Sequence, residues 1–473
     1  MSHLLRERVE LLKEGIRSTQ PDDQTTTTKH VVHERPGEPL RGAYFWLSMF
    51  YFVYCARPQD WVPGMYVFPL AKITGILTIA ALFLSVGKTE RKLSALPRET
   101  FYLLSMSLLF FISAVLSPVW KGGAFFRALD FLKVSVAWIL VFLVVTTVER
   151  LRRLVFIQAC AVAAVSVVSL IKGRSTPRLA GVLKGIYANP NEFALAIVLS
   201  LPFCFAFFLT ARGVLRKMAW AASMVVMLVT LLLTASRAGF ITLVVAGLVC
   251  IWHFAIKGRR LYLLVGGSLV FVLLLLVAGG TLKDRFLAIS GNDLRTRLEH
   301  SAYGSFEERR YLIMKSIEGI ENYPLFGIGM HNFPHYSGIW KDVHVAYLQI
   351  AVEGGIPSLV LYILFFSRAF GNLRQLRRKP SVIAEFGLLA GALHGSLVGF
   401  VVGACFAPIA YLYFPYFSGA YAAVLFATVQ EQERTEQPEK KKTIRNTFVI
   451  RNPVPRLENL HRFSGTPDRG VLR

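Results

Sequence analysis

Charged side chains are scarce in this chain. Only 17% of its 473 residues are Asp, Glu, Lys or Arg, whereas 54% are apolar, and the mean hydropathy is +0.49. A soluble domain does not need so large an apolar fraction, so the composition excludes an ordinary soluble protein. It indicates an all-α polytopic membrane protein.

Cysteines and clustered acidic residues are also rare. The five cysteines lie within or beside apolar stretches, and their spacing suits neither a disulfide framework nor a metal site. Acidic residues number 29 against 53 basic ones. No group of them has the clustering that a divalent cation needs, although Asp342 and the pair Glu307 and Glu308 stay open as exceptions. We therefore predict neither a metal nor a cofactor.

Two further features are missing. The first 40 residues are polar and contain no short apolar core before a small-residue cleavage site, so no cleavable signal peptide is expected. No internal repeat with a fixed period is visible either, although such repeats are common in transporters.

Twelve apolar stretches have about the length that a membrane-spanning helix requires. They cover residues 43–56, 68–87, 100–117, 130–148, 154–171, 193–210, 217–234, 239–256, 261–279, 344–366, 382–402 and 409–429. We expect a cytoplasmic segment 1–42 with a short amphipathic helix, spans 1–9 in 43–279, and a large periplasmic loop 280–343. Spans 10–12 then occupy 344–429, and 430–473 is a basic, disordered cytoplasmic tail.

The basic residues predict the orientation. Loops near 88–98, 150–153, 212–217, 257–260 and 368–379 are rich in Lys and Arg, whereas those near 57–67, 235–238 and 403–408 carry one basic residue or none. By the positive-inside rule, both termini are cytoplasmic. The net charge of +24 reflects this topology and the tail, which should attract anionic lipid. Nucleic-acid binding is not expected, because no recognition fold accompanies the charge.

Two of the predicted outer loops break this charge rule. One contains Lys172, Arg174, Arg178 and Lys184, and the other places Arg237 between two spans with almost no loop around it. Contacts with lipid headgroups would account for Lys172 and Arg174, but an anion site is the more economical interpretation of Arg178 and Lys184. For Arg237, a headgroup contact and a functional role both stay open.

The large loop contributes further arginines, Arg309 and Arg310. The planar guanidinium group binds phosphate oxygens through paired hydrogen bonds. Several arginines from separate loops at the lipid boundary would suit the headgroup of a polyprenyl diphosphate.

His344 begins the segment that returns from this loop into an apolar stretch. A histidine there can exchange protons near neutral pH, and it can reach a substrate whose tail lies in the bilayer. We expect Asp342 to cap a helix that begins near Val343, which would place His344 in its first turn. A purely interfacial anchor is the simpler alternative.

Four segments resemble the O-antigen ligase and polymerase superfamily of bacterial envelope enzymes. They are Arg178-Leu-Ala-Gly181 with Tyr187-Ala-Asn-Pro-Asn191-Glu-Phe-Ala, Ser236-Arg-Ala-Gly239, Arg309 followed by Tyr323-Pro-Leu-Phe-Gly-Ile-Gly329, and His344 to Ser358. The last resembles the ligase pattern of His, then Asn, Ser or Gln, nine residues, Gly, two residues, and Gly, Thr or Tyr. Val345 and Ser358 depart from it.

Other histidines fit this pattern less well. His331-Asn332 matches its opening, but Asp342 stands where the glycine is needed, so we reject this match. His335 and His394 match nothing, and we interpret them as a loop histidine and a core histidine.

The resemblance implies metal-independent transfer of a glycan from undecaprenyl diphosphate to an acceptor hydroxyl, at the periplasmic face of the bacterial inner membrane. It implies His344 as the catalytic base and Arg178, Arg237 and Arg309 as the diphosphate-binding residues. Supporting roles fall to Lys184, Asn191, Arg310, Tyr347 and Gly355. The partners would be the lipid-linked donor, membrane lipid, and an acceptor that is lipid A core, another glycan or a protein.

Other functions stay open at this point. A polymerase of glycan repeats and a protein O-glycosylation ligase share the superfamily, and the sequence does not separate them. A transporter or flippase of a lipid-linked glycan is a different class, for which internal repeats and mid-membrane charges would be expected. Lys72 and Lys133 are the candidates for such charges, and both could reach an interface instead.

Overall fold

The computed structural model describes residues 40–85, 91, 93–172, 178–179, 187–256, 260–278, 280, 297–378 and 380–451. Helices make up nearly all of the regular structure in these ranges, and no strand occurs there. The amphipathic helix expected within 1–42 and the candidate Lys184 lie outside the described residues.

Twelve long helices among the described residues coincide with the twelve predicted apolar stretches. They are α2 (Arg41–Ala56), α3 (Leu70–Leu84), α4 (Arg98–Leu116), α5 (Lys121–Val144), α6 (Val148–Lys172), α7 (Pro190–Thr210), α8 (Val214–Leu233), α9 (Arg237–Cys250), α10 (Tyr262–Ala278), α14 (Ala346–Leu376), α15 (Pro380–Gly403) and α16 (Tyr413–Arg451). Short 3₁₀ turns occupy η1 (Pro58–Asp60), η2 (Met65–Val67) and η3 (Leu93–Ala95), and the π-helical turn η5 (Ile251–Ile256) extends α9.

Seven of the described helices are long and apolar enough to cross a membrane, namely α4, α6, α7, α8, α9 with η5, α14 and the Phe386–Gly403 part of α15. The chain is thus an all-helical, multi-pass membrane protein. The count of twelve spans stays a prediction, because α3, for example, is apolar but only 15 residues long.

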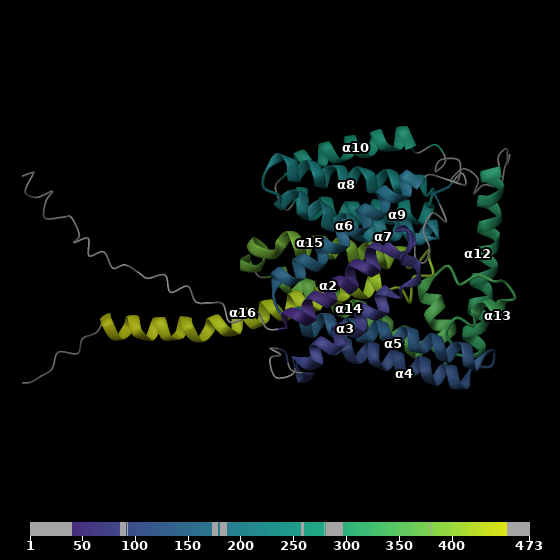
Figure 1. Ribbon diagram of the computed structural model, residues 1–473, viewed down its shortest axis with the longest axis horizontal. Helices are drawn as coiled ribbons and strands as arrows, with labels where there is room; N and C mark the ends of the chain where they lie inside the picture. The colour runs from purple at the N-terminus through teal and green to yellow at the C-terminus, as the bar shows by residue number, and fades with distance from the viewer. Residues whose placement is uncertain are drawn as a thin grey trace, which may run out of the picture.

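The long helices run roughly along one direction and form a bundle (Figure 1). Large buried aromatic side chains pack its centre, including Trp138 of α5, Tyr362 and Phe365 of α14, and Tyr416 of α16. By contrast, α10 and much of α8 expose their apolar side chains at the edge of the bundle. An exposed apolar surface of that kind is what lipid covers.

Two helices of the large loop, α12 (Arg297–Asn322) and α13 (Phe333–Ser337), lie across one end of the bundle (Figure 1). A small separate core fastens them to α14, consisting of Leu312, Ile328, Phe333, Val343 and Val352. This core holds the residues on both sides of His344 against the bundle, so it determines where the loop histidines lie.

The last helix is longer than the sequence suggested. Where a disordered tail was expected from residue 430, α16 continues to Arg451, and it projects from the bundle at the end opposite α12 (Figure 1). Its extension from 430 to 442 is rich in Glu, Gln and Lys, which favour a helix without needing a packing partner.

Candidate functional site

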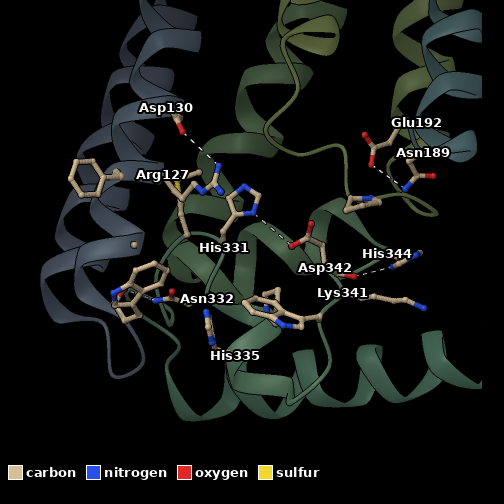
Figure 2. Close-up of a pocket in the computed structure, with 17 residues that line it drawn as sticks. Arg127, Asp130, Asn189, Glu192, His331, Asn332, His335, Lys341, Asp342 and His344 are labelled. Atoms are coloured by element: carbon tan, nitrogen blue, oxygen red, sulfur yellow. Dashed lines mark hydrogen bonds and ion pairs between the residues drawn. The ribbon is translucent and has the colours of Figure 1, made fainter. Parts of the chain in front are cut away.

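A cavity of about 720 Å³ opens at the α12 end of the bundle. Most of its lining comes from three segments: the start of α5, from Trp120 to Asp130; the start of α7, at Asn189 and Glu192; and the loop from Met330 to His344, with Pro408 completing it. Polar and charged side chains from all three point into the same space (Figure 2). Segments that are distant in the sequence therefore form one potential reaction chamber.

The start of α7 and the start of α9 are tied together by side-chain hydrogen bonds. Asn189 caps α7 by accepting from the Asn191 amide, with Pro190 at the first helical position. Ser236 caps α9 by accepting from the Gly239 amide, and its hydroxyl donates to Asn191 Oδ1 over 2.8 Å.

Arg178 joins this network. Its Nε donates to the carbonyl of Thr234 over 2.9 Å, and another guanidinium nitrogen donates to Asn191 Oδ1 over 3.3 Å. The arginine therefore braces the turn that leads into Arg237. Two of the four segments that resemble the superfamily thus form one interlocked unit.

Arg237 and Arg309 lie close enough to repel each other. Burial lowers the pKa of Arg309, and the positive charge of Arg237 lowers it further. The Nε of Arg309 is buried and has no hydrogen-bond partner among the described residues. An unpaired buried donor beside a second cation is unfavourable, so this place is suited to an anion. Arg310, by contrast, is exposed.

His344 lines the cavity and lies within electrostatic reach of Arg309. Its Nδ1 is 2.9 Å from the carbonyl oxygen of Asp342. A carbonyl can only accept, so this nitrogen carries the hydrogen and the neutral ring keeps its lone pair on Nε2. Burial lowers the pKa of His344; the bond to Asp342 opposes this shift, and the charge of Arg309 adds to it.

The predicted cap at Asp342 was wrong. The helix α14 begins at Ala346, and its N-cap residue, Val345, makes no side-chain hydrogen bond. His344 therefore lies in the loop before the helix. The carboxylate of Asp342 is turned away from the helix toward His331, with 3.7 Å between Asp342 Oδ1 and His331 Nδ1. This distance is too long for a hydrogen bond, and the contact becomes an ion pair when His331 is protonated.

His331 is the residue that sequence reasoning missed. It lines the cavity, and Figure 2 shows Asp342 between it and His344. Burial lowers the pKa of His331, but Asp342 and the charge of Glu353 outweigh this, so the pKa is raised overall. The sequence did contain a sign of this histidine, because His331-Asn332 matches the opening of the ligase pattern. We rejected that match because the required glycine is missing.

The other two rejected histidines differ in position. His335 also lines the cavity, so its interpretation as a simple loop residue was incomplete. His394 is far away in the helix bundle, where its ring nitrogen lies 3.0 Å from that of His253, as expected for a core histidine.

A break in α14 at Gly355 is the docking point of the Tyr323–Gly329 segment. Gly355 has a φ of +80°, which interrupts the helix and leaves carbonyls of the preceding turn unused. The amides of Ile328 and Gly329 donate to the carbonyls of Val352 and Glu353, over 2.9 and 3.0 Å. The Tyr323–Gly329 segment thus docks onto this break, and Gly355 has a structural role.

Tyr347 also has a structural contact, since its hydroxyl donates to the carbonyl of Val401 over 3.0 Å. Among the described residues, no three His, Cys, Asp or Glu side chains gather as a metal site would require. Metal-independent chemistry stays a prediction.

Residues 222–363 match the model of a protein family described as O-antigen ligase. The match supports a place in the O-antigen ligase superfamily. No curated protein matches the chain. The O-antigen ligase match begins within α8 and ends within α14, so it includes the Ser236 turn, α12, the Tyr323–Gly329 segment and His344. It supports a ligase or polymerase that acts on glycans in a membrane.

Proposed function

We propose that this protein transfers a glycan from undecaprenyl diphosphate to an acceptor hydroxyl at the periplasmic face of the bacterial inner membrane. The α12 end of the bundle then faces the periplasm and both termini face the cytoplasm. The observation that carries the proposal is the position of His344, which lines the cavity with an uncharged ring favoured, within electrostatic reach of the half-buried Arg309.

The reaction needs one proton transfer and one substitution. The acceptor oxygen attacks the anomeric carbon of the donor sugar, a new glycosidic bond forms, and the bond from that carbon to the diphosphate oxygen breaks. The acceptor proton passes to Nε2 of His344, because Nδ1 already donates to Asp342. General-base assistance of this kind contributes about 10² to 10⁴ in rate.

The leaving group is an undecaprenyl diphosphate, whose negative charge increases as the bond breaks. In this proposal Arg237 and Arg309 stabilise that charge; its support is that they come from different elements and lie within electrostatic reach of each other. Arg178 holds the turn before Arg237 through Thr234 and Asn191, and a phosphate oxygen is the natural further ligand for its guanidinium group. Lys184 is retained as a supporting contact from the sequence alone.

Polymerisation of glycan repeats and glycosylation of a protein use the same chemistry with a different acceptor. A transporter is less well supported, because the candidate residues combine a base with an anion site at one end of the bundle.

The decisive experiment is glycan transfer by purified protein in nanodiscs, with EDTA present. It uses a polyprenyl-diphosphate-linked glycan and, in turn, lipid A core, free glycan and protein acceptors. We expect His344→Ala to lower transfer by at least 10²-fold while binding of the lipid donor is retained. Lys315→Gln, at a half-exposed position on α12 outside the cavity, is the matched control and should behave as wild type.

Wild-type activity in His344→Ala would remove this histidine from the chemistry. Activity that EDTA abolishes and a divalent metal restores would refute the metal-independent mechanism. Donor binding without transfer to any acceptor would instead favour a transporter.

A further inference from the structure

A fully buried carboxyl lies at the break in α14, and the proposed reaction does not use it. Glu353 is 0% exposed. Its Oε2 accepts a hydrogen bond from the Tyr411 hydroxyl over 2.6 Å, whereas its Oε1 is buried and makes no hydrogen bond within the described part of the chain. Burying a carboxyl with incomplete hydrogen bonding is costly unless a nearby cation compensates it. The structure should therefore contain a reason for an acid at this position.

The side chain that approaches this carboxyl is His331. The backbone amide of His331 faces the Glu353 carboxyl, and the two side chains interact through their charges. The rings of His331 and Tyr411 lie 5.3 Å apart between centroids. From the loop, the carboxylate of Asp342 reaches the same imidazole at 3.7 Å. Two carboxyls from different segments thus act on one imidazole, and an imidazolium compensates both.

Other groups around His331 oppose its positive charge without cancelling this effect. Burial lowers the pKa of His331, and Arg127 of α5 acts in the same direction. That guanidinium group is itself partnered by Asp130, at 3.8 Å, on the other side of the imidazole from Asp342 (Figure 2). The carboxyls outweigh burial and Arg127, so the pKa of His331 is raised overall.

The backbone around His331 is fixed from two helices. Its φ of +55° lies in the left-handed region, which residues other than glycine seldom adopt. The adjacent Asn332 donates to Ser117 Oγ, at the end of α4, over 2.8 Å. The amide of Gly329 donates to the carbonyl of Glu353 over 3.0 Å. Strained backbone that its surroundings hold in this way tends to serve a function.

We propose that His331 is a positioning residue for His344, held as an imidazolium by the carboxyls of Asp342 and Glu353. The imidazolium fixes the side chain of Asp342, whose carbonyl accepts from Nδ1 of His344 over 2.9 Å. The lone pair on Nε2 of His344 is thereby kept free for the acceptor proton. Glu353 is the buried charge that keeps His331 protonated. This inference rests on the proposed function, in which His344 is the base.

Glu353→Gln separates a role of charge from a role in packing. Glutamine has nearly the same shape and can still accept from the Tyr411 hydroxyl, but it has no negative charge. Ser113→Ala is the matched control. The Ser113 hydroxyl donates to the backbone carbonyl of Glu353 over 2.8 Å, so its removal disturbs the same residue and leaves the carboxyl in place.

The test is nitrogen-15 NMR of the histidine rings in the full chain in nanodiscs, without substrate. The signals are assigned from their loss in His331→Gln and His344→Gln. In the wild type we expect His331 to titrate above the ordinary value of 6.5, and His344 to carry its hydrogen on Nδ1 at neutral pH. Glu353→Gln should lower the pKa of His331. Arg127→Gln should raise it, because a nearby cation is removed.

The tautomer of His344 reports the positioning itself. Both Glu353→Gln and His331→Gln should give a mixture of its two tautomers, because Asp342 is no longer held by a cation. In the transfer assay both variants should lower kcat by about tenfold to 10²-fold and leave KM for the lipid-linked donor unchanged. Ser113→Ala should change neither the tautomer nor kcat. Should Glu353→Gln fold poorly, His331→Gln still tests the link to His344, because that side chain is only partly buried.

Three outcomes would overturn the inference: Glu353→Gln leaves the pKa of His331 unchanged, His344 keeps its Nδ1 hydrogen in His331→Gln, or Ser113→Ala reproduces the effects of Glu353→Gln. The expected NMR results without transfer to any acceptor would leave this arrangement standing and refute the proposed function. Wild-type transfer that depends on His344, with no change of the tautomer or of kcat in His331→Gln, would do the reverse.

Discussion

At the scale of single residues, Asp342 organises the site. Its carboxylate pairs with His331 and its carbonyl fixes the tautomer of His344. One loop residue thus contacts two histidines whose pKa values shift in opposite directions. The pKa of His331 is raised and that of His344 is lowered. Divergent environments of this kind separate a charged group from a neutral base.

The lowered pKa of His344 predicts a pH profile. The base form should prevail at neutral pH, so the transfer rate should fall only on acidification below the usual histidine value of 6.5. Burial, Arg309 and Lys341 all lower this pKa, while the Asp342 carbonyl and Glu308 raise it. Lys341→Gln should therefore shift the acid limb of kcat to higher pH. An unmoved limb, or a shift matched by Lys315→Gln, would contradict this assignment.

The proposed phosphate contact of Arg309 predicts that Arg309 and its neighbour Arg310 respond differently to replacement by lysine. Arg309→Lys should lower transfer by about tenfold or more, because lysine cannot reproduce the planar guanidinium fork. Arg310→Lys, at the adjacent exposed position, should have little effect. The check is KM for the lipid-linked donor and kcat for both variants. Equal losses, or near-normal activity in Arg309→Lys, would count against a phosphate contact.

At the scale of elements, the site depends on the break in α14. The Tyr323–Gly329 segment can dock only because the helix stops at Gly355 and releases its carbonyls. That docking, together with the small core around Leu312 and Val343, carries α12 and the histidine loop to the bundle. The interruption at Gly355 therefore positions Arg309 and His344, although Gly355 and the docked segment take no part in the chemistry.

Gly355→Ala tests this arrangement. The added Cβ would clash with the backbone carbonyl of Leu325, at a φ that disfavours any residue except glycine. We expect a loss of about 2 kcal/mol or more in stability, measured as a lower Tm in detergent, together with reduced transfer. Gly371→Ala is the control on the same helix, because its Cβ would meet no atom within 4 Å. Similar Tm values for both variants would refute the docking model.

At the scale of the whole molecule, the two ends of the bundle differ in structure. The α12 end contains the cavity, whereas the far end of α5 is fastened by a buried arginine. Arg91 donates to the carbonyls of Phe142 and Val145, and it forms two 3.0 Å bonds with the Glu431 carboxylate. It thereby links α5 to α16.

Arg91→Ala should therefore affect stability and not the chemistry. Removing it leaves buried carbonyls unsatisfied, so we expect a loss of roughly 3 kcal/mol, detected as a lower Tm, with kcat retained below that temperature. Arg152→Ala, at an exposed position on α6, should leave the Tm unchanged. A normal Tm for Arg91→Ala would show that these bonds contribute little.

The sequence by itself determined the features that depend on local interactions. Apolar runs predicted the helices because a helix in lipid satisfies its own hydrogen bonds, and the Asn189 and Ser236 caps and the break near Gly355 follow from the conformational preferences of a few residues.

Only the tertiary structure decided which partners these residues meet. It paired Asp342 with His331 instead of a helix end, and it placed Trp120 and His335 on one wall from positions more than 200 residues apart. The physical reason is that charge pairs and cavity walls depend on the packing of distant segments, and no local pattern in the sequence encodes that packing.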